Sequence, residues 1–426
     1  MIIQPASSLK GTLSIPGDKS ISHRSIMFGS IAEGETRIYN FLMGDDCLST
    51  IRCFRQLGIH IEMCPDSILV QGKGLHGLSK SDTILDCGNS GTTTRLISGI
   101  LAGQSFTSTL TGDASIQKRP MNRIMVPLKA INAHIEGKDD SYCPLTITPS
   151  TLTGINYASP VASAQVKSCI LLAGLYADSP VTVSEPSISR DHTERMLKAF
   201  GAKIETEGKC VTVHPNSHLT GREVIVPGDI SSAAFFMVAG LIVPNSKLTL
   251  KNVGINPTRR GLLDALLEMG GRITCLNERE LCGEPVCDMI VESSHLKGIT
   301  ISGDIIPTMI DEIPAFAVAA LFAEGTTTVK DAKELRVKES NRIDTMTNEL
   351  TKMGAHITPQ EDGLIIEGGY PLQGAKLESY DDHRIAMSLA VASLMASSPS
   401  EIENSECVRI SYPHFFEHLK EVSMYD

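Results

Sequence analysis

The stretch PGDKSISHR at residues 16–24 places a lysine and a serine directly after a Gly-Asp turn, with an arginine four residues past the serine. A turn that leads into a helix presents unpaired N–H groups and the positive end of the helix dipole, which suits a phosphate or a carboxylate. The nucleotide-binding P-loop needs a glycine directly before the lysine, and Asp18 stands there instead. The stretch therefore predicts an anion site of another kind.

Polar residues of the same kind stand where other helices rich in small residues are expected to begin. Each has an ordinary structural interpretation as well: Asp18 and Asp229 suit helix N-caps, and Arg24 suits a surface ion pair that contributes little stability. The shared position at helix starts favours a common anion site. The residues in question are Lys19, Ser20 and Arg24; Asn89, Ser90 and Gly91; Ser163 and Gln165; Asp311; and Asp382, His383 and Arg384.

Two further stretches carry clustered cations. In RVKESNR at 336–342, Lys338 and Arg342 would share one helical face, although a solvated helix face explains this pattern equally well. In QKRPMNR at 117–123, Arg119 precedes a proline in a loop that leads into an amphipathic helix. Because arginine forks bind phosphate and carboxylate bidentately, these stretches together predict a ligand with more than one such group.

Composition limits the class of protein. The chain has 426 residues, 42% hydrophobic and 20% charged, with a net charge of −11. Nucleic-acid binders usually carry a basic face, so we expect no nucleic-acid partner. The longest apolar runs, such as 233–243, are too short to span a bilayer, and we expect no membrane partner. Eleven scattered cysteines and no visible targeting segment predict a reduced, cytoplasmic protein.

A repeat organises the chain. Residues 9–38 and 219–250 both show a strand, Pro-Gly-Asp, a helix rich in small residues, a glycine-containing exit and another strand. An amphipathic helix and two alternating strands follow each of the first five copies, which predicts β-α-β-α-β-β units at intervals of roughly 65–80 residues. Looser copies lie at 89–112, 163–184, 310–331 and 381–403.

The first helix of each copy is nearly apolar or small on every side, as in AAFFMVAGLIV at 233–243. Such helices are usually buried all round, so we expect an α/β (α+β) fold in which sheets wrap buried helices. The sixth copy lacks its closing strands, and the strand-like residues 1–15 could complete it. The chain would then cross twice between two similar domains of three units each. These are 19–226, and 1–18 with 227–426, with the active site in the cleft between them.

The motifs together resemble the 5-enolpyruvylshikimate-3-phosphate (EPSP) synthase family. The matching pieces stand in family order over nearly the whole chain. The resemblance implies the enolpyruvyl transferase fold, an inside-out α/β barrel, which agrees with the repeat count. The pieces are PGDKSISHR, NSGTTTR, KRPM, SAQVKS, IDEIP, RVKESNRI, DDHRIAM and SYPHFF.

The resemblance also implies a reaction. The 5-hydroxyl of shikimate 3-phosphate attacks carbon 2 of phosphoenolpyruvate, and the tetrahedral intermediate loses phosphate to leave an enolpyruvyl ether on the path to chorismate. No cofactor and no metal are implied, and we expect a monomer. The residues carried over for shikimate 3-phosphate are Lys19, Ser20, Arg24, Ser163, Gln165, Arg190, Asp311 and Lys338. Those for phosphoenolpyruvate are Lys19, Asn89, Gly91, Arg119, Gln165, Arg342 and Arg384.

The chemistry of this reaction requires a base, an acid and several cations. Asp311 suits the general base that accepts the hydroxyl proton. Glu339 is the favoured acid for protonating carbon 3, with Lys19 as an alternative. A carboxyl group in that role needs a raised pKa, which a closed, dry site would supply. Arginine and lysine side chains would offset the charge of the intermediate.

Some positions depart from the family pattern. Relatives carry a lysine where Ile410 stands and a proline where Leu96 follows Arg95, and these choices resemble the branch that glyphosate, a phosphoenolpyruvate competitor, inhibits less easily. Two alternative functions are possible for a chain with these motifs. The related UDP-N-acetylglucosamine enolpyruvyl transferase has Lys-Asn in place of Lys19-Ser20. A non-catalytic phosphometabolite-binding module would have lost some of Asp311, Lys338 and Glu339, and all are present.

Overall fold

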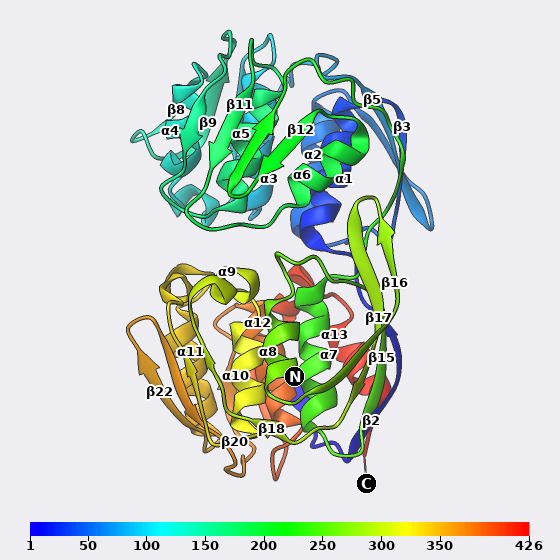
Figure 1. Ribbon diagram of the computed structural model, residues 1–426, viewed down its shortest axis with the longest axis vertical. Helices are drawn as coiled ribbons and strands as arrows, with labels where there is room; N and C mark the ends of the chain where they lie inside the picture. The colour runs from blue at the N-terminus through cyan, green and yellow to red at the C-terminus, as the bar shows by residue number, and fades with distance from the viewer. Residues whose placement is uncertain (426) are drawn as a thin grey trace. The chain divides into compact units, whose positions relative to one another are not determined.

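The computed structural model describes residues 1–425, and tertiary contacts divide the chain into two compact units (Figure 1). The N-terminal unit contains Gly17–Pro227 and Glu280–Glu284. The C-terminal unit contains Met1–Pro16, Gly228–Arg279 and the chain from Pro285 onward. Compared with the predicted division, the N-terminal unit gains one or two residues at each chain crossing and a short segment from a hairpin.

That hairpin is formed by β16 (Arg272–Leu281) and β17 (Glu284–Glu292). Its turn belongs to the N-terminal unit, where the buried carboxylate of Glu284 lies 2.8 Å from Nδ1 of His192. Nothing in the repeat pattern predicts this reassignment, because the hairpin looks like the closing strands of any other copy.

The N-terminal unit combines helices with three four-stranded sheets among the described residues. The sheet orders are β14-β3-β5-β4, β6-β7-β9-β8 and β10-β11-β13-β12. The helices are α1 (Lys19–Ile31), α2 (Asp45–Gln56), α3 (Gly91–Ala102), α4 (Asn122–Ala130), α5 (Ala164–Gly174) and α6 (His192–Phe200). The strands are β3 (Glu33–Tyr39), β4 (His60–Met63), β5 (Ser67–Lys73), β6 (Leu85–Asp86), β7 (Ser108–Thr111), β8 (His134–Lys138), β9 (Tyr142–Thr148), β10 (Asn156–Ala158), β11 (Val181–Ser184), β12 (Ile204–Glu207), β13 (Cys210–Val213) and β14 (Glu223–Ile225).

The C-terminal unit has the same kinds of element. Its larger sheets have the orders β16-β17-β15-β2-β26 and β19-β21-β23-β22. The helices are α7 (Ile230–Ile242), α8 (Gly261–Glu268), α9 (Ile306–Met309), α10 (Ile313–Leu321), α11 (Arg342–Lys352), α12 (His383–Ser393) and α13 (Phe415–Val422). The other strands are β1 (Ile2–Ile3), β2 (Ser8–Ser14), β15 (Lys247–Gly254), β18 (Leu296–Lys297), β19 (Thr300–Ile301), β20 (Ala323–Glu324), β21 (Thr326–Val329), β22 (His356–Gln360), β23 (Gly363–Glu367), β24 (Lys376–Glu378), β25 (Ser400–Glu403) and β26 (Ser423–Met424).

One pairing rule recurs in these sheets, with an exchange where the chain crosses. The strand before a buried helix pairs in parallel with the strand after it, as β10 does with β11 across α5. At the crossings the partners are exchanged: β2 precedes α1 but pairs with β15, and β14 precedes α7 but pairs with β3. Each exchanged pair lies within one unit, so the chain passes between units in the short connections from β2 to α1 and from β14 to α7. At the N-terminus, β1 pairs antiparallel with β25, whereas β2 joins β15 and β26.

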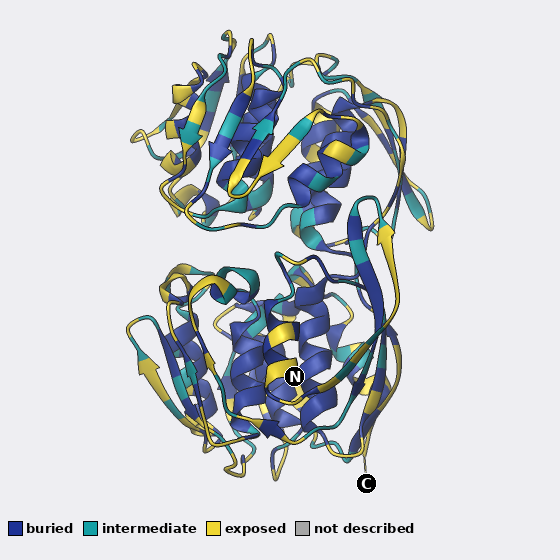
Figure 2. Ribbon diagram, in the orientation of Figure 1, coloured by how far each residue is buried: buried dark blue, intermediate teal, exposed yellow. Residues whose placement is uncertain are grey.

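The small-residue helices form the cores, as Figure 2 shows in dark blue. All thirteen residues of α7 are buried, which confirms the predicted burial of this helix on every side. Small residues allow close approach: a Cβ added at Gly240 would lie 2.9 Å from Cγ1 of Val291. The amphipathic helix α2 instead keeps one face exposed. Within residues 1–425, no helix has the length and apolar character needed to cross a membrane.

We expect Phe236→Ala to destabilise the protein by about 3–5 kcal/mol, because the ring is fully buried and packs against Tyr412 and Phe415 with centroids 5.8 and 5.6 Å away. The measurement is the urea midpoint of unfolding. Val126→Ala, at an exposed position on α4, is the control and should leave that midpoint nearly unchanged. Equal midpoints for both variants would contradict the assignment of α7 to the core.

Candidate active site

The first predicted anion site lies at the start of α1. Oδ1 of Asp18 accepts a hydrogen bond of 2.9 Å from the N–H of Ile21, which confirms Asp18 as an N-cap. Lys19 is the first residue of the helix, and its ammonium group forms an ion pair with Asp46 at the start of α2. The carbonyl of Ser20 accepts a 2.9 Å bond from Nη1 of Arg24. The first two turns of α1 therefore hold both predicted cations.

Arg24 is buried, so its interpretation as a surface ion pair is wrong. Its Nε donates to Oγ1 of Thr193 at 2.7 Å, and its Nη2 donates to Oγ of Ser168 at 2.9 Å. Burial lowers the pKa of Arg24 to about 10; carboxylates nearby offset part of this effect, and Arg190 adds a smaller lowering. At neutral pH the guanidinium stays charged and links α1, α5 and α6.

A second cluster surrounds the start of α3. Nη2 of Arg119 donates to Oδ1 of Asn89 at 2.9 Å and lies 3.1 Å from Oγ of Ser115. The amide of Asn89 donates in turn to Asp113 at 2.8 Å. Arg119 thus reaches back from the loop before α4 to the residues that precede α3.

Arg95, one turn into α3, completes this cluster. Its Nη1 donates to Oε1 of Gln165 at 2.6 Å, and a Cβ added at Gly91 would lie only 2.8 Å from the same Nη1. Burial, together with the charges of Arg123 and Arg119, lowers the pKa of Arg95 to about 10. Three arginines therefore lie close enough to influence one another, which is an arrangement that a phosphate or carboxylate would stabilise.

Ser163 and Arg190 flank a buried ion cluster. Ser163 is the N-cap of α5, and its N–H donates to Oε1 of Glu185 at 2.9 Å. Glu185 also lies 3.0 Å from Nζ of Lys167, and it accepts a 2.8 Å bond from the hydroxyl of Ser189, which precedes Arg190. Glu185 therefore fixes the helix start and the loop that carry these two predicted residues.

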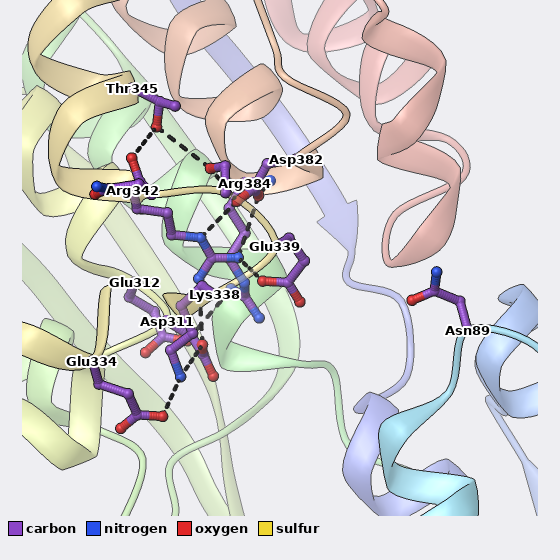
Figure 3. Close-up of polar contacts among 12 residues, drawn as sticks. Asn89, Asp311, Glu312, Glu334, Lys338, Glu339, Arg342, Thr345, Asp382 and Arg384 are labelled. Atoms are coloured by element: carbon purple, nitrogen blue, oxygen red, sulfur yellow. Dashed lines mark hydrogen bonds and ion pairs between the residues drawn. The ribbon is translucent and has the colours of Figure 1, made fainter. Parts of the chain in front are cut away.

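In the C-terminal unit, Arg342 is the centre of an ion-pair network (Figure 3). It is 1% exposed, and its Nε and Nη2 lie 2.8 and 3.2 Å from the two carboxylate oxygens of Asp382. Its Nη2 donates to Oε2 of Glu339 at 2.7 Å, and its Nη1 lies 3.4 Å from Oδ1 of Asp311. Three carboxylates around one guanidinium raise its pKa even against burial.

Lys338 joins this network by a route that the sequence did not predict. The stretch 333–337 is a 3₁₀ turn, Lys338 is extended, and α11 begins only at Arg342. The expected shared helical face is therefore wrong, because Asn341 caps α11 and ends the preceding turn. Nζ of Lys338 lies 3.6 Å from Oδ1 of Asp311 and 2.7 Å from Oε1 of Glu334. Asp311, rather than a helix, brings Lys338 and Arg342 together.

Glu339 does not have the raised pKa that an acid would need. Burial raises the pKa of this carboxyl, but the charges of Arg342 and His383 outweigh burial and lower it to about 2. The side chain is 41% exposed, so solvent also supports the charged form. In the state described here Glu339 is a carboxylate at neutral pH.

Arg384 is the second residue of α12, and its N–H donates to Oδ1 of Asp382 at 3.0 Å. Its Nη1 lies 3.7 Å from Oε1 of Glu312. The carboxylate of Asp382 therefore contacts both predicted arginines of this unit. It binds the guanidinium of Arg342 and the backbone N–H of Arg384.

Within each unit, the structure groups most of the predicted residues. Asn89, Gly91, Arg119 and Gln165 form one group, and Ser20 and Arg24 another. Sequence reasoning missed the residues that hold these side chains. The spacing of Gly91 and Arg95 on one helical face, and the position of Glu312 beside Asp311, were signals that could have indicated two of them. The missed residues are Asp46, Arg95, Glu185 and Glu312.

A family model described as EPSP synthase (3-phosphoshikimate 1-carboxyvinyltransferase) matches residues 3–419. The chain belongs to the EPSP synthase family. It is a carboxyvinyltransferase of the shikimate pathway, which leads to chorismate and the aromatic amino acids. Its fold is the mixed α/β enolpyruvyl transferase fold.

Curated relatives and solved structures agree with this family. A 3-phosphoshikimate 1-carboxyvinyltransferase of Thermoanaerobacter sp. (strain X514) is 59% identical over 408 residues, 96% of each chain. One from Bacillus thuringiensis (strain Al Hakam) is 56% identical over 99% of each chain. A solved EPSP synthase from Acinetobacter baumannii is 47% identical, with a TM-score of 0.93 over 99% of this chain and 98% of that one. The enolpyruvyl transferase NikO from Streptomyces tendae, at 17% identity and a TM-score of 0.83, shares the fold.

The low pKa of Glu339 makes stability depend on pH. An unfolded glutamate has a pKa of 4.5, so between about pH 4.5 and 2 the unfolded protein binds the proton more readily, and stability falls as pH falls. We expect Glu339→Gln to lose this part of the acid dependence and to match the wild type's slope above pH 5. Urea midpoints measured between pH 3 and 6 check this. Identical pH slopes for both proteins throughout would contradict the ion pair.

If Gly91 lies at the phosphoenolpyruvate site, as the sequence predicts, Gly91→Ala should raise the KM for phosphoenolpyruvate about tenfold, because the new Cβ would displace the buried guanidinium of Arg95 and its bond to Gln165. The KM for shikimate 3-phosphate serves as the internal control and should change little. Steady-state kinetics with each substrate varied in turn gives both constants. An unchanged KM for phosphoenolpyruvate would remove Gly91 from that site.

Proposed function

We propose that residues of both units transfer the carboxyvinyl group of phosphoenolpyruvate to the 5-hydroxyl of shikimate 3-phosphate by addition and elimination. The hydroxyl oxygen bonds to carbon 2 of phosphoenolpyruvate while carbon 3 gains a proton. The tetrahedral intermediate then gives up the proton at carbon 3 and loses phosphate. The observation that carries this proposal is the ion-pair network of Arg342, in which two carboxylates (Asp311 and Glu339) and two cations (Lys338 and Arg342) are joined by ion pairs.

Shikimate 3-phosphate would bind to groups in both units. In the N-terminal unit these lie at the starts of α1 and α5, where the positive end of the helix dipole adds to the cations. The rigid hydrogen bonds of Arg24 and the support of Ser163 by Glu185 favour a preformed site. The proposed residues are Lys19, Ser20, Arg24, Ser163, Gln165 and Arg190 in that unit, and Asp311 and Lys338 in the C-terminal unit.

Phosphoenolpyruvate carries a phosphate and a carboxylate and so needs several cations. The mutual repulsion of Arg95, Arg119 and Arg123 in the unliganded cluster supports an anion there. The arginines at the starts of α11 and α12 would supply the second group of contacts. The proposed residues are Lys19, Asn89, Gly91, Arg119 and Gln165, with Arg342 and Arg384.

Asp311 would act as the base. Its Oδ1 lies 3.6 Å from Lys338 and 3.4 Å from Arg342, and the side chain is 18% exposed, so a substrate hydroxyl can reach it. The two cations hold the carboxylate in a fixed direction, and the proton that leaves the 5-hydroxyl would pass to it.

Glu339 would become an acid only after its partner is taken away. If the carboxylate or phosphate of phosphoenolpyruvate engages Arg342, the charge that lowers the pKa of Glu339 is neutralised. A substrate that also covers the 41% exposed side chain would strengthen the effect of burial, which raises that pKa. Binding of the substrate would thus create the acid that protonates carbon 3. Lys19, which pairs with Asp46, stays the alternative proton donor.

The remaining parts of the proposal concern organisation. Three β-α-β-α-β-β copies in each unit would agree with the exchanged strand pairs at both crossings. Closure of the two halves on the substrates would complete the site. Eleven free cysteines are in keeping with a cytoplasmic location. A monomer suffices for this scheme, because one chain supplies every residue named.

Release of phosphate tests the reaction. The protein is mixed with phosphoenolpyruvate and, in separate reactions, with shikimate 3-phosphate, UDP-N-acetylglucosamine or no acceptor. We expect phosphate only with shikimate 3-phosphate, together with an enolpyruvyl product of the expected mass. Release with the UDP-sugar alone, or no release with any acceptor, would overturn the proposed function.

Arg119→Ala should lower kcat/KM at least about 100-fold, or roughly 3 kcal/mol, because a charged contact to the developing phosphate is lost. Lys118→Ala removes an exposed cation from the neighbouring position and is the matched control. Steady-state kinetics of both variants decides. A rate for Arg119→Ala equal to that of the control would exclude Arg119 from the site.

A further inference from the structure

Glu312 is a buried carboxylate that the reaction above does not use. It follows Asp311 and stands at the N-cap position of α10, but its side chain makes no capping bond to that helix. The side chain is 0% exposed, whereas that of Asp311 is 18% exposed. Glu312 therefore cannot touch a substrate in this state and needs another explanation, since burying a charge is costly unless it is paired.

The partners of Glu312 come from the starts of two other helices. Its Oε1 accepts a hydrogen bond from the hydroxyl of Ser231 in the first turn of α7. The same oxygen lies 3.7 Å from Nη2 of Arg259 and 3.7 Å from Nη1 of Arg384. Its Oε2 has no hydrogen-bond partner among the residues that the structure describes. One carboxylate thus stands between two guanidinium groups.

The two arginines differ in their surroundings. Arg259 is buried, and its Nη2 also donates to Oγ of Ser231 at 2.5 Å and lies 3.4 Å from Asp229. Arg384 is 14% exposed at the start of α12 and is the outer member of the cluster. Glu312 therefore joins an arginine fixed inside the unit to one that can meet solvent or a ligand.

The physical consequence concerns direction. An arginine has five N–H groups in a rigid fork, so an ion pair on the Nη1 side draws that side of the guanidinium toward the carboxylate and leaves the other N–H groups available. Without the charge of Glu312, Arg384 would lose its ion pair. The positive charge of Arg259 would then repel it without a carboxylate between the two guanidinium groups. It would then turn away from its present position.

We propose that Glu312 is a positioning residue for phosphoenolpyruvate: held by Ser231 and Arg259, its carboxylate fixes the guanidinium of Arg384 so that the remaining N–H groups meet the anion. This rests on the proposed contact of Arg384 with phosphoenolpyruvate. A helix cap would require a bond to α10, and the side chain of Glu312 makes none. A general base would require access to the substrate, and this side chain is fully buried.

Glu312→Gln tests the proposal, because the amide keeps the shape of the side chain and removes its charge. We expect the KM for phosphoenolpyruvate to rise at least about tenfold, with kcat and the KM for shikimate 3-phosphate within about threefold of the wild type. Glu367→Gln, an exposed glutamate of the same unit, is the control and should change none of these constants. A KM for phosphoenolpyruvate within about twofold of the wild type would overturn the proposal.

A double variant separates positioning from charge balance. Arg259→Met with Glu312→Gln removes one charge of each sign from the cluster, so it should fold even if the single variant does not. We expect its KM for phosphoenolpyruvate to stay raised, because Arg384 still lacks its anchor. Recovery of the wild-type KM in this double variant would mean that Glu312 only balances the charge of Arg259, and the proposal would fail.

Arg384→Ala distinguishes a failure of this inference from a failure of the proposed function. If Arg384→Ala raises the KM for phosphoenolpyruvate and Glu312→Gln does not, the contact of Arg384 stands and the role of Glu312 is wrong. If Arg384→Ala leaves that KM unchanged, the proposed contact itself is wrong, and this inference falls with it.

Discussion

The ion pair between Arg342 and Asp382 is the interaction on which the C-terminal site depends. Both side chains are almost fully buried, and two nitrogens of the guanidinium face the two oxygens of the carboxylate. A buried charge is stable only with a partner, so neither residue can be understood without the other. Asp382 also accepts the backbone N–H of Arg384, so that one carboxylate sets both the direction of Arg342 and the start of α12.

The same principle explains how a chain with a net charge of −11 can hold sites for anions. Several of the cations that we place near a substrate have a carboxylate beside them: Asp46 for Lys19, Asp311 for Lys338 and Glu312 for Arg384. These carboxylates position the cations before the ligand arrives, at a cost in desolvation. Arriving phosphate and carboxylate groups can then compete with them for the same N–H groups. Glu339 is the case in which this competition would have a chemical consequence.

Much of this arrangement could be predicted from the sequence, because it depends on residues that are close together in the chain. Helix N-termini have recognisable caps, so Lys19, Gly91 and Arg384 could be assigned to helix starts. The total burial of α7 followed from its apolar and small residues. The error at 336–342 was also local, since Asn341 followed by Asp344 is a capping pattern that the clustered charges obscured.

What the sequence could not supply depends on contacts between distant segments. The burial of Arg24 requires Thr193 and Ser168, and the transfer of residues 280–284 to the N-terminal unit requires His192. No periodicity contains these pairings. The sign of the pKa shift of Glu339 is of the same kind, because it is decided by opposing effects of burial and of Arg342 whose sizes depend on three-dimensional distances.

Proton uptake on binding is the most direct measurement of the idea that substrate takes Arg342 away from Glu339. Calorimetric titration of phosphoenolpyruvate into the enzyme without shikimate 3-phosphate, so that no turnover occurs, at about pH 5 in buffers of different ionisation enthalpy, gives the number of protons bound. We expect the wild type to take up more protons than Glu339→Gln, because the pKa of the freed carboxyl rises from about 2. Equal uptake by the two proteins would contradict the account.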